Sequence, residues 1–436
     1  MSALTNTPVV LVMRHSLGPR FDHLECMSRL GLEIHLVSES AAATADPRFA
    51  TVTLIDSGST TEDLAEATER RIHESGARCA VTYLEADIVA VGEANARAGV
   101  PWARPATDAI ARDKRLQRLH LAKHPIPSPS FLEVRDEEAA IAALADLDGP
   151  WIVKPTRGGN SAHVVLASDH RAVRAALSGI RAFANSRVYY LYDDLPDVWA
   201  LIEEYLPGDE VTCDGVVIDG HFHLGGIHAK YVGPGPCFEE DLYTLPLPDD
   251  RSEEEIVGVV AALVASLDLV HALFNVELRR GRDGRYHVVE FSTRISGGHV
   301  YRNILDVHAI DLVELHLLAL LHDPDQAASY ARQRHPGRMA TCIRFVYRTG
   351  IVAENSAGPA AQDPAFRAYY PLAAVGDAVA AAPAGFDMCG LLSVRERLTP
   401  GEHPERIHAT ARRVEQLLSL RVTSPAPVAA GETGPA

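Results

Sequence analysis

The chain has 436 residues, of which 47% are hydrophobic and 23% charged, and its formal net charge is −17. This length allows two or three domains with ordinary cores. The acidic balance argues against nucleic acid or an anionic membrane as a general partner, although it leaves room for a local basic cleft. Six cysteines occur without any CxxC pair, which favours reduced thiols in a cytoplasmic protein over a zinc site or a disulfide framework.

The N-terminal part alternates between short apolar runs and helical patterns. Strands are predicted at 8–13, 30–40, 51–56 and 77–85, and helices at 18–30, 60–75 and 86–98. The opening MSALTNTPVVLVM has no basic segment, so it predicts a first strand rather than a signal peptide. No apolar stretch reaches about 18 residues, so we expect no membrane span. The alternation predicts a small parallel α/β sheet, and no GxGxxG follows its first strand.

The rest of the chain predicts strands and helices in a less regular order. Helices are predicted at 106–123, 169–183, 252–270, 307–322 and 403–419, and strands at 150–155, 164–168, 198–219 (with a break), 221–231 and after 338. Ser252 is expected to cap its helix, with Glu255 at the capping-box position. The tail at 423–436 has no apolar periodicity and is predicted to be disordered.

Two short apolar runs, NVEL and VVEF, each contain one glutamate and flank the turn RRGRDGRY. A two-residue type I′ turn at Asp283-Gly284 would place Glu277 directly opposite Glu290, and Asn275 opposite Ser292. Two carboxylates that close repel each other, and a divalent cation between them removes the repulsion. A solvated hairpin or a slipped register is the simpler alternative.

Basic residues and glycines precede this hairpin. Lys154 ends the apolar strand WIVKP, and the loop TRGGNSA follows, with Gly158, Gly159 and Ser161. Backbone N–H groups of such a loop approach phosphate oxygens closely, and a neighbouring lysine neutralises phosphate charge. The sequence is not a GxxxxGK[ST] P-loop, and a plain hairpin loop is the alternative. Lys114, on the preceding helix, is by itself an ordinary surface lysine.

The segment EEYLPGDE breaks a strand with Pro-Gly, and it contains Glu203, Glu204, Tyr205, Leu206 and Glu210. Backbone groups at such a break could bind the edge of a planar ring, and Glu210 could accept bonds from the adjacent hydroxyls of a ribose. An ordinary turn with solvated acids is the alternative.

Arg294 follows Glu290 by four residues. Its guanidinium could bind a substrate carboxylate or the charge that develops on a phosphate; a salt bridge to an Asp or Glu of the protein is the alternative. Taken in order, the lysines, glycine loop, strand break, paired glutamates and arginine fit one ligand, a magnesium nucleoside triphosphate.

In this order the motifs resemble the ATP-grasp superfamily over roughly 80–325, and most closely its carboxylate–amine ligases, such as bacterial L-amino acid ligases (dipeptide synthetases). The resemblance implies an α/β chain that is α+β in its central part. It would comprise a Rossmann-like domain at 1–105, a linker helix at 106–125, a lid and hinge at 126–212 and a C-terminal mixed-sheet domain with the metal site at 213–422.

The resemblance also implies roles for single residues. Lys114 and Lys154 would contact ATP phosphates, the loop at 158–162 would close over them, and the backbone of 203–206 would hold adenine, with Glu210 on the ribose. Glu277 and Glu290 would bridge Mg²⁺, or Mn²⁺ in its place. The usual pattern is E-x-N-x-R, so Ser292 stands where an asparagine ligand to a second metal ion is expected. Arg294 would steady the acyl phosphate.

The expected activity is ligation of a small carboxylate to an amine, both such as amino acids, through an acyl phosphate. The candidate substrate residues are His228, Lys230, Arg294, Gly297, Gly298 and His299. A bicarbonate-using carboxylase is the second hypothesis, although its R-x-Q-V-E-H pattern is missing after Arg294. A non-catalytic ATP-binding protein is the third, and a homodimer is a further assembly to consider.

Overall fold

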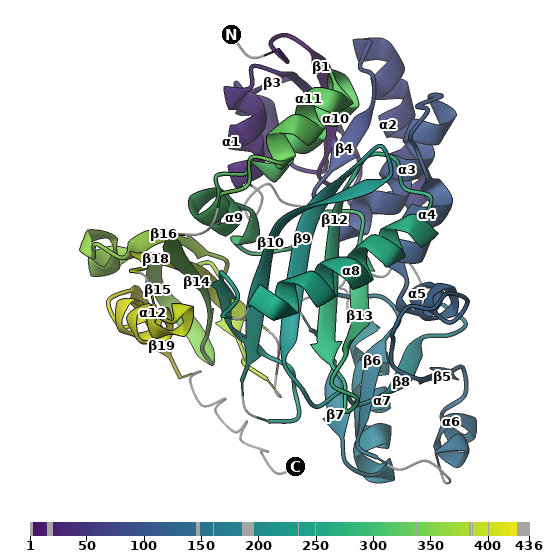
Figure 1. Ribbon diagram of the computed structural model, residues 1–436, viewed down its shortest axis with the longest axis vertical. Coiled ribbons are helices and arrows are strands. Elements are labelled where there is room, and N and C mark those ends of the chain that lie inside the picture. Colours follow the sequence, from purple (N-terminus) through teal and green to yellow (C-terminus); the bar gives the residue numbers. More distant parts are fainter. Residues whose placement is uncertain are drawn as a thin grey trace, which may run out of the picture.

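The computed structural model describes residues 3–14, 21–144, 149–159, 161–184, 196–233, 235–248, 250–335, 338–382, 385, 387–399 and 401–424. Within these ranges the chain forms four β-sheets with helices around them (Figure 1). The predicted α/β fold class is confirmed. Residues from 425 onwards, which belong to the segment predicted to be disordered, lie outside the described ranges.

The N-terminal region is the predicted parallel sheet, in the order β3-β2-β1-β4. Its strands are β1 (Pro8–Val12), β2 (Glu33–Ser38), β3 (Phe49–Leu54) and β4 (Ala80–Thr82), and its helices are α1 (Phe21–Arg29), α2 (Thr61–Ser75) and α3 (Ile88–Arg97). Thr60 and Asp63 form a reciprocal capping box that begins α2, and Gly76 ends the helix in the left-handed conformation.

The prediction of a single helix at 106–123 is wrong. The chain forms α4 (Pro105–Arg112) and α5 (Lys114–Leu121), separated by Asp113 in an extended conformation. The Asp113 carboxylate accepts hydrogen bonds from the backbone N–H groups of Arg115 and Leu116, so it caps a new helix at the point where one was expected to continue. As a result Lys114 is the first residue of α5, and its side chain is buried.

The second sheet is antiparallel, in the order β5-β8-β6-β7. It consists of β5 (Phe131–Val134), β6 (Trp151–Pro155), β7 (Val165–Ala167) and β8 (Ala200–Glu204), covered by α6 (Glu137–Ala143) and α7 (His170–Ala184). Figure 1 shows it at the far end of the molecule from the parallel sheet. The predicted domain limits stay a prediction, although β8 and the next strand belong to different sheets.

The large sheet has eight strands in the order β13-β12-β9-β10-β11-β14-β18-β16. They are β9 (Glu210–Ile218), β10 (His221–Val232), β11 (Glu240–Leu245), β12 (Ala272–Arg280), β13 (Tyr286–Ser292), β14 (Met339–Tyr347), β16 (Phe366–Pro371) and β18 (Met388–Arg397). A mixed sheet was expected, but every neighbouring pair is antiparallel, since several consecutive strands follow each other directly as hairpins. A small third sheet and α12 (Ile407–Glu415) lie beyond it: β17 (Ala378–Val379), β15 (Gly350–Ser356) and β19 (Ser419–Thr423).

The alternation of side chains along β12 decides where the site lies. Phe274, Val276 and Leu278 are buried in one hydrophobic cluster with the apolar stripe of α8 (Asp250–Ser266). Asn275, Glu277 and Arg279 therefore face the other side of the sheet. Figure 1 shows α8 lying across the face of these strands, which leaves the opposite face for polar chemistry.

The predicted cap of α8 is wrong. The helix begins at Asp250, so Ser252 lies inside it and accepts a hydrogen bond from Arg280. Glu255 accepts the backbone N–H of Tyr286, so it binds the hairpin rather than its own helix end.

The predicted helix at 307–322 is two helices, and a third was missed. They are α9 (Val300–His308), α10 (Leu312–Leu321) and α11 (Pro324–Ala331). Ala309 ends α9 with a φ of 57°, and Asp311 begins α10 by accepting the N–H of Glu314. Apolar periodicity alone did not show this break.

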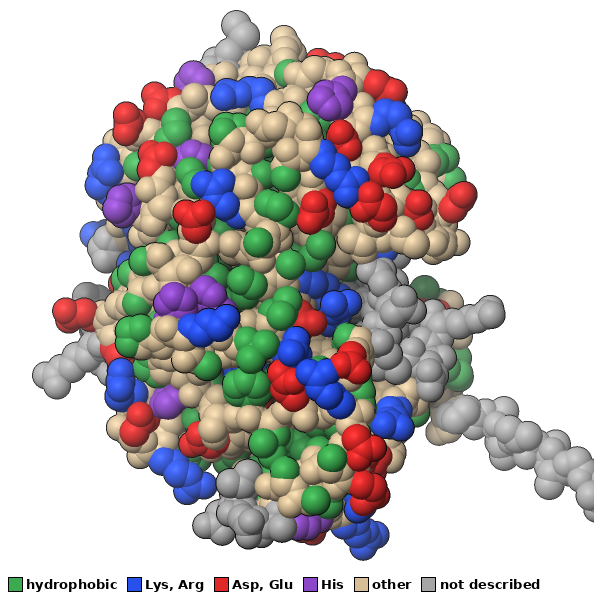
Figure 2. All heavy atoms as spheres, turned by 90° about the vertical axis from the view of Figure 1, so that its right-hand side faces the viewer, with side chains coloured by type: hydrophobic (Ala, Val, Ile, Leu, Met, Phe, Trp, Pro, Cys, Tyr) green, Lys and Arg blue, Asp and Glu red, His purple; other side chains and the backbone are tan. Residues whose placement is uncertain are grey.

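Charges on the surface are mixed. On the face drawn in Figure 2, acidic and basic side chains are interspersed and hydrophobic side chains occur in small groups. No helix in the described part of the chain is long and apolar enough to span a membrane.

Asp311 joins the N-terminal region to the helices that follow the large sheet. Its carboxylate is 1% exposed and accepts hydrogen bonds from the Arg29 guanidinium on α1 at 2.6 Å and from the Tyr301 hydroxyl on α9 at 2.9 Å. Since the same carboxylate caps α10, one buried side chain holds three helices together.

Replacing Asp311 with alanine should lower the free energy of unfolding by about 3 kcal/mol, because it removes a helix cap and leaves the Tyr301 hydroxyl buried without its partner. Denaturant titration followed by tryptophan fluorescence would measure the change. Asp325→Ala, at an exposed position on α11, is the matched control and should change the midpoint little. Equal effects of the two substitutions would contradict the role of Asp311.

Candidate active site

The predicted pairing of the two glutamates is confirmed, although the predicted turn is wrong. Glu277 lies opposite Glu290 and Asn275 opposite Ser292, but the register shifts by one residue between Glu277 and Leu278. Only Gly284 has a positive φ in the turn, and the N–H of Gly284 bonds to the carbonyl of Gly281. The loop is thus one residue longer than expected, and a bulge in β13 restores the register.

Each glutamate of this pair forms an ion pair with a lysine from another element. Lys114 Nζ lies 2.8 Å from Glu290 Oε1, and Lys230 Nζ on β10 lies 3.0 Å from Glu277 Oε2. Burial, together with nearby carboxylates, raises the pKa of Glu277 to about 7 despite Lys230. Burial acts in the same direction on Glu290, but Lys114 and Lys154 hold its pKa below the usual value. The site therefore concentrates negative charge where two strands meet.

Lys154 lies in a second, fully buried ion pair. Its Nζ is 2.8 Å from Glu203 Oε2, and Arg118 on α5 donates from Nε to Glu203 Oε1 at 2.8 Å. Burial lowers the pKa of Lys154 to about 8, against the attraction of Glu203. Burial opposes ionisation of Glu203 as well, yet Arg118 and Lys154 keep its pKa below the usual value. Near pH 7 both groups are charged, so Lys154 presents an ammonium ion beside the site.

One cleft connects these groups. Its lining combines charged and apolar side chains: Lys114, Pro129, Ile152, Lys154, Val164, Glu203, Glu204, Tyr205, Leu206, Glu210, Phe238, Glu277, Arg279, Val289 and Glu290. Eight predicted site residues from distant parts of the sequence therefore line one cleft: Lys154, Glu203, Glu204, Tyr205, Leu206, Glu210, Glu277 and Glu290.

Arg279 organises the strand-break end of this cleft. It donates from Nε to the Leu206 carbonyl and from Nη1 to Glu210 Oε2, both at 2.7 Å, and its guanidinium carbon lies within 5.5 Å of the ring centres of Tyr205 and Phe238. Lys230 takes the other oxygen of Glu210 at 2.7 Å. Despite burial, these two cations hold the pKa of Glu210 below its usual value.

The glycine loop begins next to Lys114. The Gly158 carbonyl accepts from Lys114 Nζ at 3.4 Å, and the backbone N–H of Lys114 donates to Thr156. Gly158 and Ser161 both have positive φ values, and no atom lies within 4 Å of a Cβ built on Gly159. Among the described residues of 156–162, this open backbone lies beside the lysines, as the phosphate-loop hypothesis requires.

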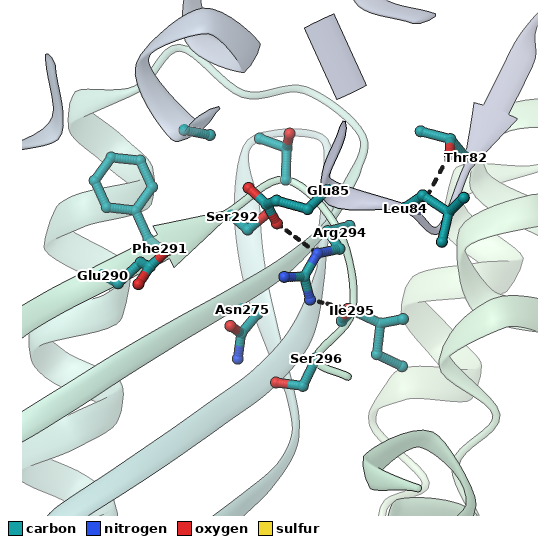
Figure 3. Close-up of polar contacts among 12 residues, drawn as sticks. Thr82, Leu84, Glu85, Asn275, Glu290, Phe291, Ser292, Arg294, Ile295 and Ser296 are labelled. Carbon is teal, nitrogen blue, oxygen red and sulfur yellow. Dashed lines mark hydrogen bonds and ion pairs between the residues drawn. The ribbon is translucent and has the colours of Figure 1, made fainter. Parts of the chain in front are cut away.

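Arg294 and Ser292 converge on a carboxylate from the N-terminal region (Figure 3). Glu85 Oε2 accepts from Arg294 Nε at 2.5 Å and from the Ser292 hydroxyl at 2.9 Å. Glu85 begins a short 3-10 helix (Glu85–Asp87) directly after β4. Ser292 therefore joins Arg294 in binding Glu85, and this contact between distant segments fixes the end of β13.

Asn275 does not reach toward the same carboxylate. Its side-chain amide donates to Thr212 Oγ1 at 2.6 Å and to Asp214 Oδ2 at 3.2 Å. Asp214 also accepts from the backbone N–H and hydroxyl of Ser296, at 2.7 and 2.9 Å. This buried network holds the turn after Arg294 against β9.

The two candidate histidines are not cations. Burial lowers the pKa of His228 to about 3, and its Nε2 lies 3.3 Å from the Asn303 side-chain amide. Burial also lowers the pKa of His299 to about 3, and its ring stacks on Tyr370. Both rings are therefore neutral near pH 7, and a role of either histidine in binding substrate stays a prediction. Lys230 lies at the glutamates, and Gly298 packs near Ile343 and Leu391 with a φ of 65°.

The facing glutamates fit a magnesium ion. Mg²⁺ in nucleotide sites takes one or two carboxylates and completes its shell with phosphate oxygens and water. No group of three or more His, Cys, Asp or Glu side chains that could hold a metal ion occurs in the part of the chain that the structure describes. Glu277 and Glu290 supply two carboxylates on one face, which matches a metal shared with phosphate rather than one enclosed by protein.

Sequence reasoning missed Arg118, Glu85 and Arg279. Arg118 follows Lys114 by four residues, so helical spacing on α5 could have placed both on one face. Arg279 follows Glu277 by two residues, so strand alternation could have placed it in the cleft. Glu85 gave no comparable signal, because its partners lie about two hundred positions away in the chain.

Comparison with known proteins agrees with this geometry. Residues 147–302 match the model of the ATP-grasp domain family. Alanine–anticapsin ligase of Bacillus subtilis (strain 168) is 24% identical over 279 residues, which cover 61% of this chain and 58% of that protein. Human carnosine synthase 1 is 25% identical over 230 residues, covering 49% and 27% of the two chains. The chain thus spans little more than half the length of the first of these relatives.

Among solved structures, an L-amino acid ligase from Bacillus licheniformis superimposes with a TM-score of 0.80 at 19% identity, over 96% of this chain and all of that one. The 2-oxoglutarate carboxylase biotin carboxylase domain of Hydrogenobacter thermophilus superimposes with a TM-score of 0.69 at 12% identity, over 96% and 91%. The fold is therefore shared with both ligases and carboxylases. Residues 147–302 thus resemble the ATP-grasp domain family, and the sequence relatives include proteins named as ligases.

Proposed function

We propose that this protein is an ATP-dependent ligase that joins a small carboxylate to an amine, with ADP and phosphate as the other products. The observation that carries the proposal is the cleft itself. Two buried lysines and two facing glutamates line one space. Arg294, held by Glu85 of the N-terminal region, lies near enough to Glu290 to lower the pKa of that carboxyl. Phosphoryl transfer needs this combination of positioning and charge neutralisation.

In this proposal the nucleotide lies along the cleft, with the base at Tyr205 and Leu206 and the phosphates at Lys114 and Lys154. Glu210 would accept from the ribose, although Arg279 and Lys230 already occupy its oxygens, so these contacts must be shared or rearranged. The Leu206 carbonyl is likewise bonded to Arg279, which leaves the other backbone groups of 203–206 for adenine.

Glu277 and Glu290 would hold the magnesium ion, which when bound neutralises phosphate charge between ATP and an anionic substrate. Ser292 donates its hydroxyl proton to Glu85, so it could offer a second ion only the lone pairs of a neutral oxygen. We therefore infer that any second ion is held more weakly than the first.

The chemistry proceeds in two displacements. A carboxylate oxygen of the substrate attacks the γ-phosphorus, the bond to ADP breaks, and an acyl phosphate forms. The amine nitrogen then attacks the acyl carbon, the carbon–oxygen bond breaks, and phosphate leaves with that oxygen while the amine loses a proton. Arg294, held by Glu85, would stabilise the charge on the acyl phosphate and on its tetrahedral successor.

The relatives narrow the substrate class. Their names include an alanine ligase, a carnosine synthase and D-alanine–D-alanine ligases, for example that of Clostridium perfringens. We infer that one substrate here is an amino acid and that the product is a dipeptide or a related amide. All six cysteines are free, which supports a reducing compartment such as the cytoplasm.

A phosphate-release screen over amino acids and small carboxylates, supplied singly and in pairs, tests this activity. Phosphate should appear only when an acid, an amine, ATP and Mg²⁺ are all present. Glu290→Ala should reduce that release by at least about 100-fold, because it removes one of two metal ligands, whereas Glu254→Ala at an exposed position on α8 should leave most of it. Release with bicarbonate alone would contradict the ligase, and full activity of Glu290→Ala would contradict the metal assignment.

Glu85→Gln should lower kcat by about 10- to 100-fold, because a misplaced Arg294 loses its alignment with the reacting groups. The KM for ATP should change less than about twofold, since Glu85 lies outside the nucleotide cleft. Steady-state kinetics give both constants. Glu66→Gln on the exposed face of α2 is the control. A rise in KM with an unchanged kcat would show that Glu85 does not position Arg294.

The pH dependence of kcat/KM for ATP should report the ionisation of Lys154. Burial lowers its pKa to about 8, so the ammonium is present below that pH and is lost as the pH rises through it. We expect kcat/KM for ATP to fall above about pH 8. Lys154→Arg keeps its charge throughout and should remove this alkaline decline, at reduced overall activity. An identical decline in the arginine variant would assign it to another group.

A further inference from the structure

A second cavity lies outside the nucleotide cleft and shares no residue with it. It lies beside β4, the edge strand of the parallel sheet, and reaches α3, α4, α10 and the start of β12. The N-terminal region, the linker helices and the large sheet all contribute to its lining, so the cavity lies where three parts of the molecule meet.

One carboxylate in this cavity, that of Asp108, forms no ion pair in the described part of the chain. Asp108 lies on α4 and accepts a hydrogen bond from the Thr293 hydroxyl at 2.7 Å. A Cβ built on Gly92 would lie 2.3 Å from Asp108 Oδ2, so the carboxylate packs directly against a bare glycine of α3. Burial, against the Thr293 hydrogen bond, raises the pKa of Asp108 to about 7.

The remaining lining is aromatic and apolar apart from a few polar side chains, chiefly Asn95 and Arg104. Arg104 is paired with Asp268 at 3.1 Å, and the Asn95 amide is bonded to the backbone of Ala80. Trp102 and His271 meet edge to face with centroids 5.9 Å apart, and His316 is 9% exposed with its Nδ1 unbonded among the described residues. Burial lowers the pKa of His316 to about 3, so its ring is neutral. Val91 and Leu320 complete apolar parts of the wall.

This combination selects one kind of ligand. A metal ion would need several oxygen or nitrogen ligands, and no group of three acidic, histidine or cysteine side chains suited to a metal is found in the described chain. An organic ammonium ion instead needs one carboxylate and the faces of aromatic rings. A neutral imidazole nitrogen can accept one further N–H.

We propose that this cavity is a second binding site, for a small organic ammonium ion without a carboxylate of its own, with Asp108 as its anionic partner. The site is separate from the proposed nucleotide cleft, and its existence does not rest on the proposed ligase activity. Thr293, which donates to Asp108, stands between Ser292 and Arg294 in the chain. A ligand that binds Asp108 therefore competes with, or adds to, the hydrogen bond from Thr293, which holds the segment that carries Arg294.

The test uses methylammonium, ethylammonium and tetramethylammonium chloride as probes, with potassium chloride at equal ionic strength as reference. Thermal unfolding and calorimetric titration of the full chain, without ATP, should show saturable binding of at least one organic cation and none of potassium. Asp108→Asn should weaken that binding by about tenfold or more, since a hydrogen bond to a charged group is lost.

Asp197→Asn, an exposed carboxylate in the β5-β8-β6-β7 region, is the matched control and should bind the probe as the wild type does. If Asp108→Asn does not fold, His316→Leu provides a second variant that removes a polar contact but keeps the carboxylate, and weaker binding is expected there too. No saturable binding, equal binding of potassium, or undiminished binding in the cavity variants would overturn the proposal. Phosphate release from ATP, measured in parallel, tests the proposed ligase activity and does not decide whether the organic cations bind.

Discussion

The direct opposition of Glu277 and Glu290 on one face of the large sheet is the constraint around which the site is built. The opposite face of the same strands packs against α8 through Phe274, Val276 and Leu278, so strand alternation forces the glutamates to the other side. There they lie close together in a poorly solvated place. Like charges so arranged are unfavourable unless cations accompany them.

The accompanying cations come from elements that are distant in the sequence. Lys114 begins α5 only because Asp113 breaks the preceding helix, and Lys230 comes from β10. Arg294 is held from a third direction by Glu85, which belongs to the N-terminal region. The site therefore depends on the packing of the N-terminal region against the large sheet. Asp311 contributes to this packing, because it accepts hydrogen bonds from Arg29 of α1 and Tyr301 of α9.

The sequence predicted this site better than it predicted several elements around it. Alternation within one hairpin placed Glu277 opposite Glu290, because that pattern is local. Lys154 and Glu203 were grouped with them only through the order of the motifs and the resemblance to a known family. The sequence did not show that the loop at Gly284 is one residue longer than a two-residue turn, nor that β13 has a bulge before Glu290. The longer loop and the bulge shift the strand register in opposite directions, so the predicted pairing of the glutamates is still correct. Helix breaks at Asp113 and Ala309 were missed because apolar periodicity continues through them. The neutrality of His228 and the contact of Glu85 with Arg294 depend on tertiary burial, which no local pattern contains.

The most direct test of the account follows the oxygen atoms of the carboxylate substrate. Once an accepted acid and amine are known, the acid is supplied with both carboxylate oxygens labelled with ¹⁸O, and the released phosphate is analysed by mass spectrometry. Ligation through an acyl phosphate predicts one ¹⁸O atom in each phosphate and one in the amide. Unlabelled phosphate, formed at the same rate as the amide, would show that the γ-phosphate goes to water or to another acceptor, and it would contradict the proposed function of the cleft.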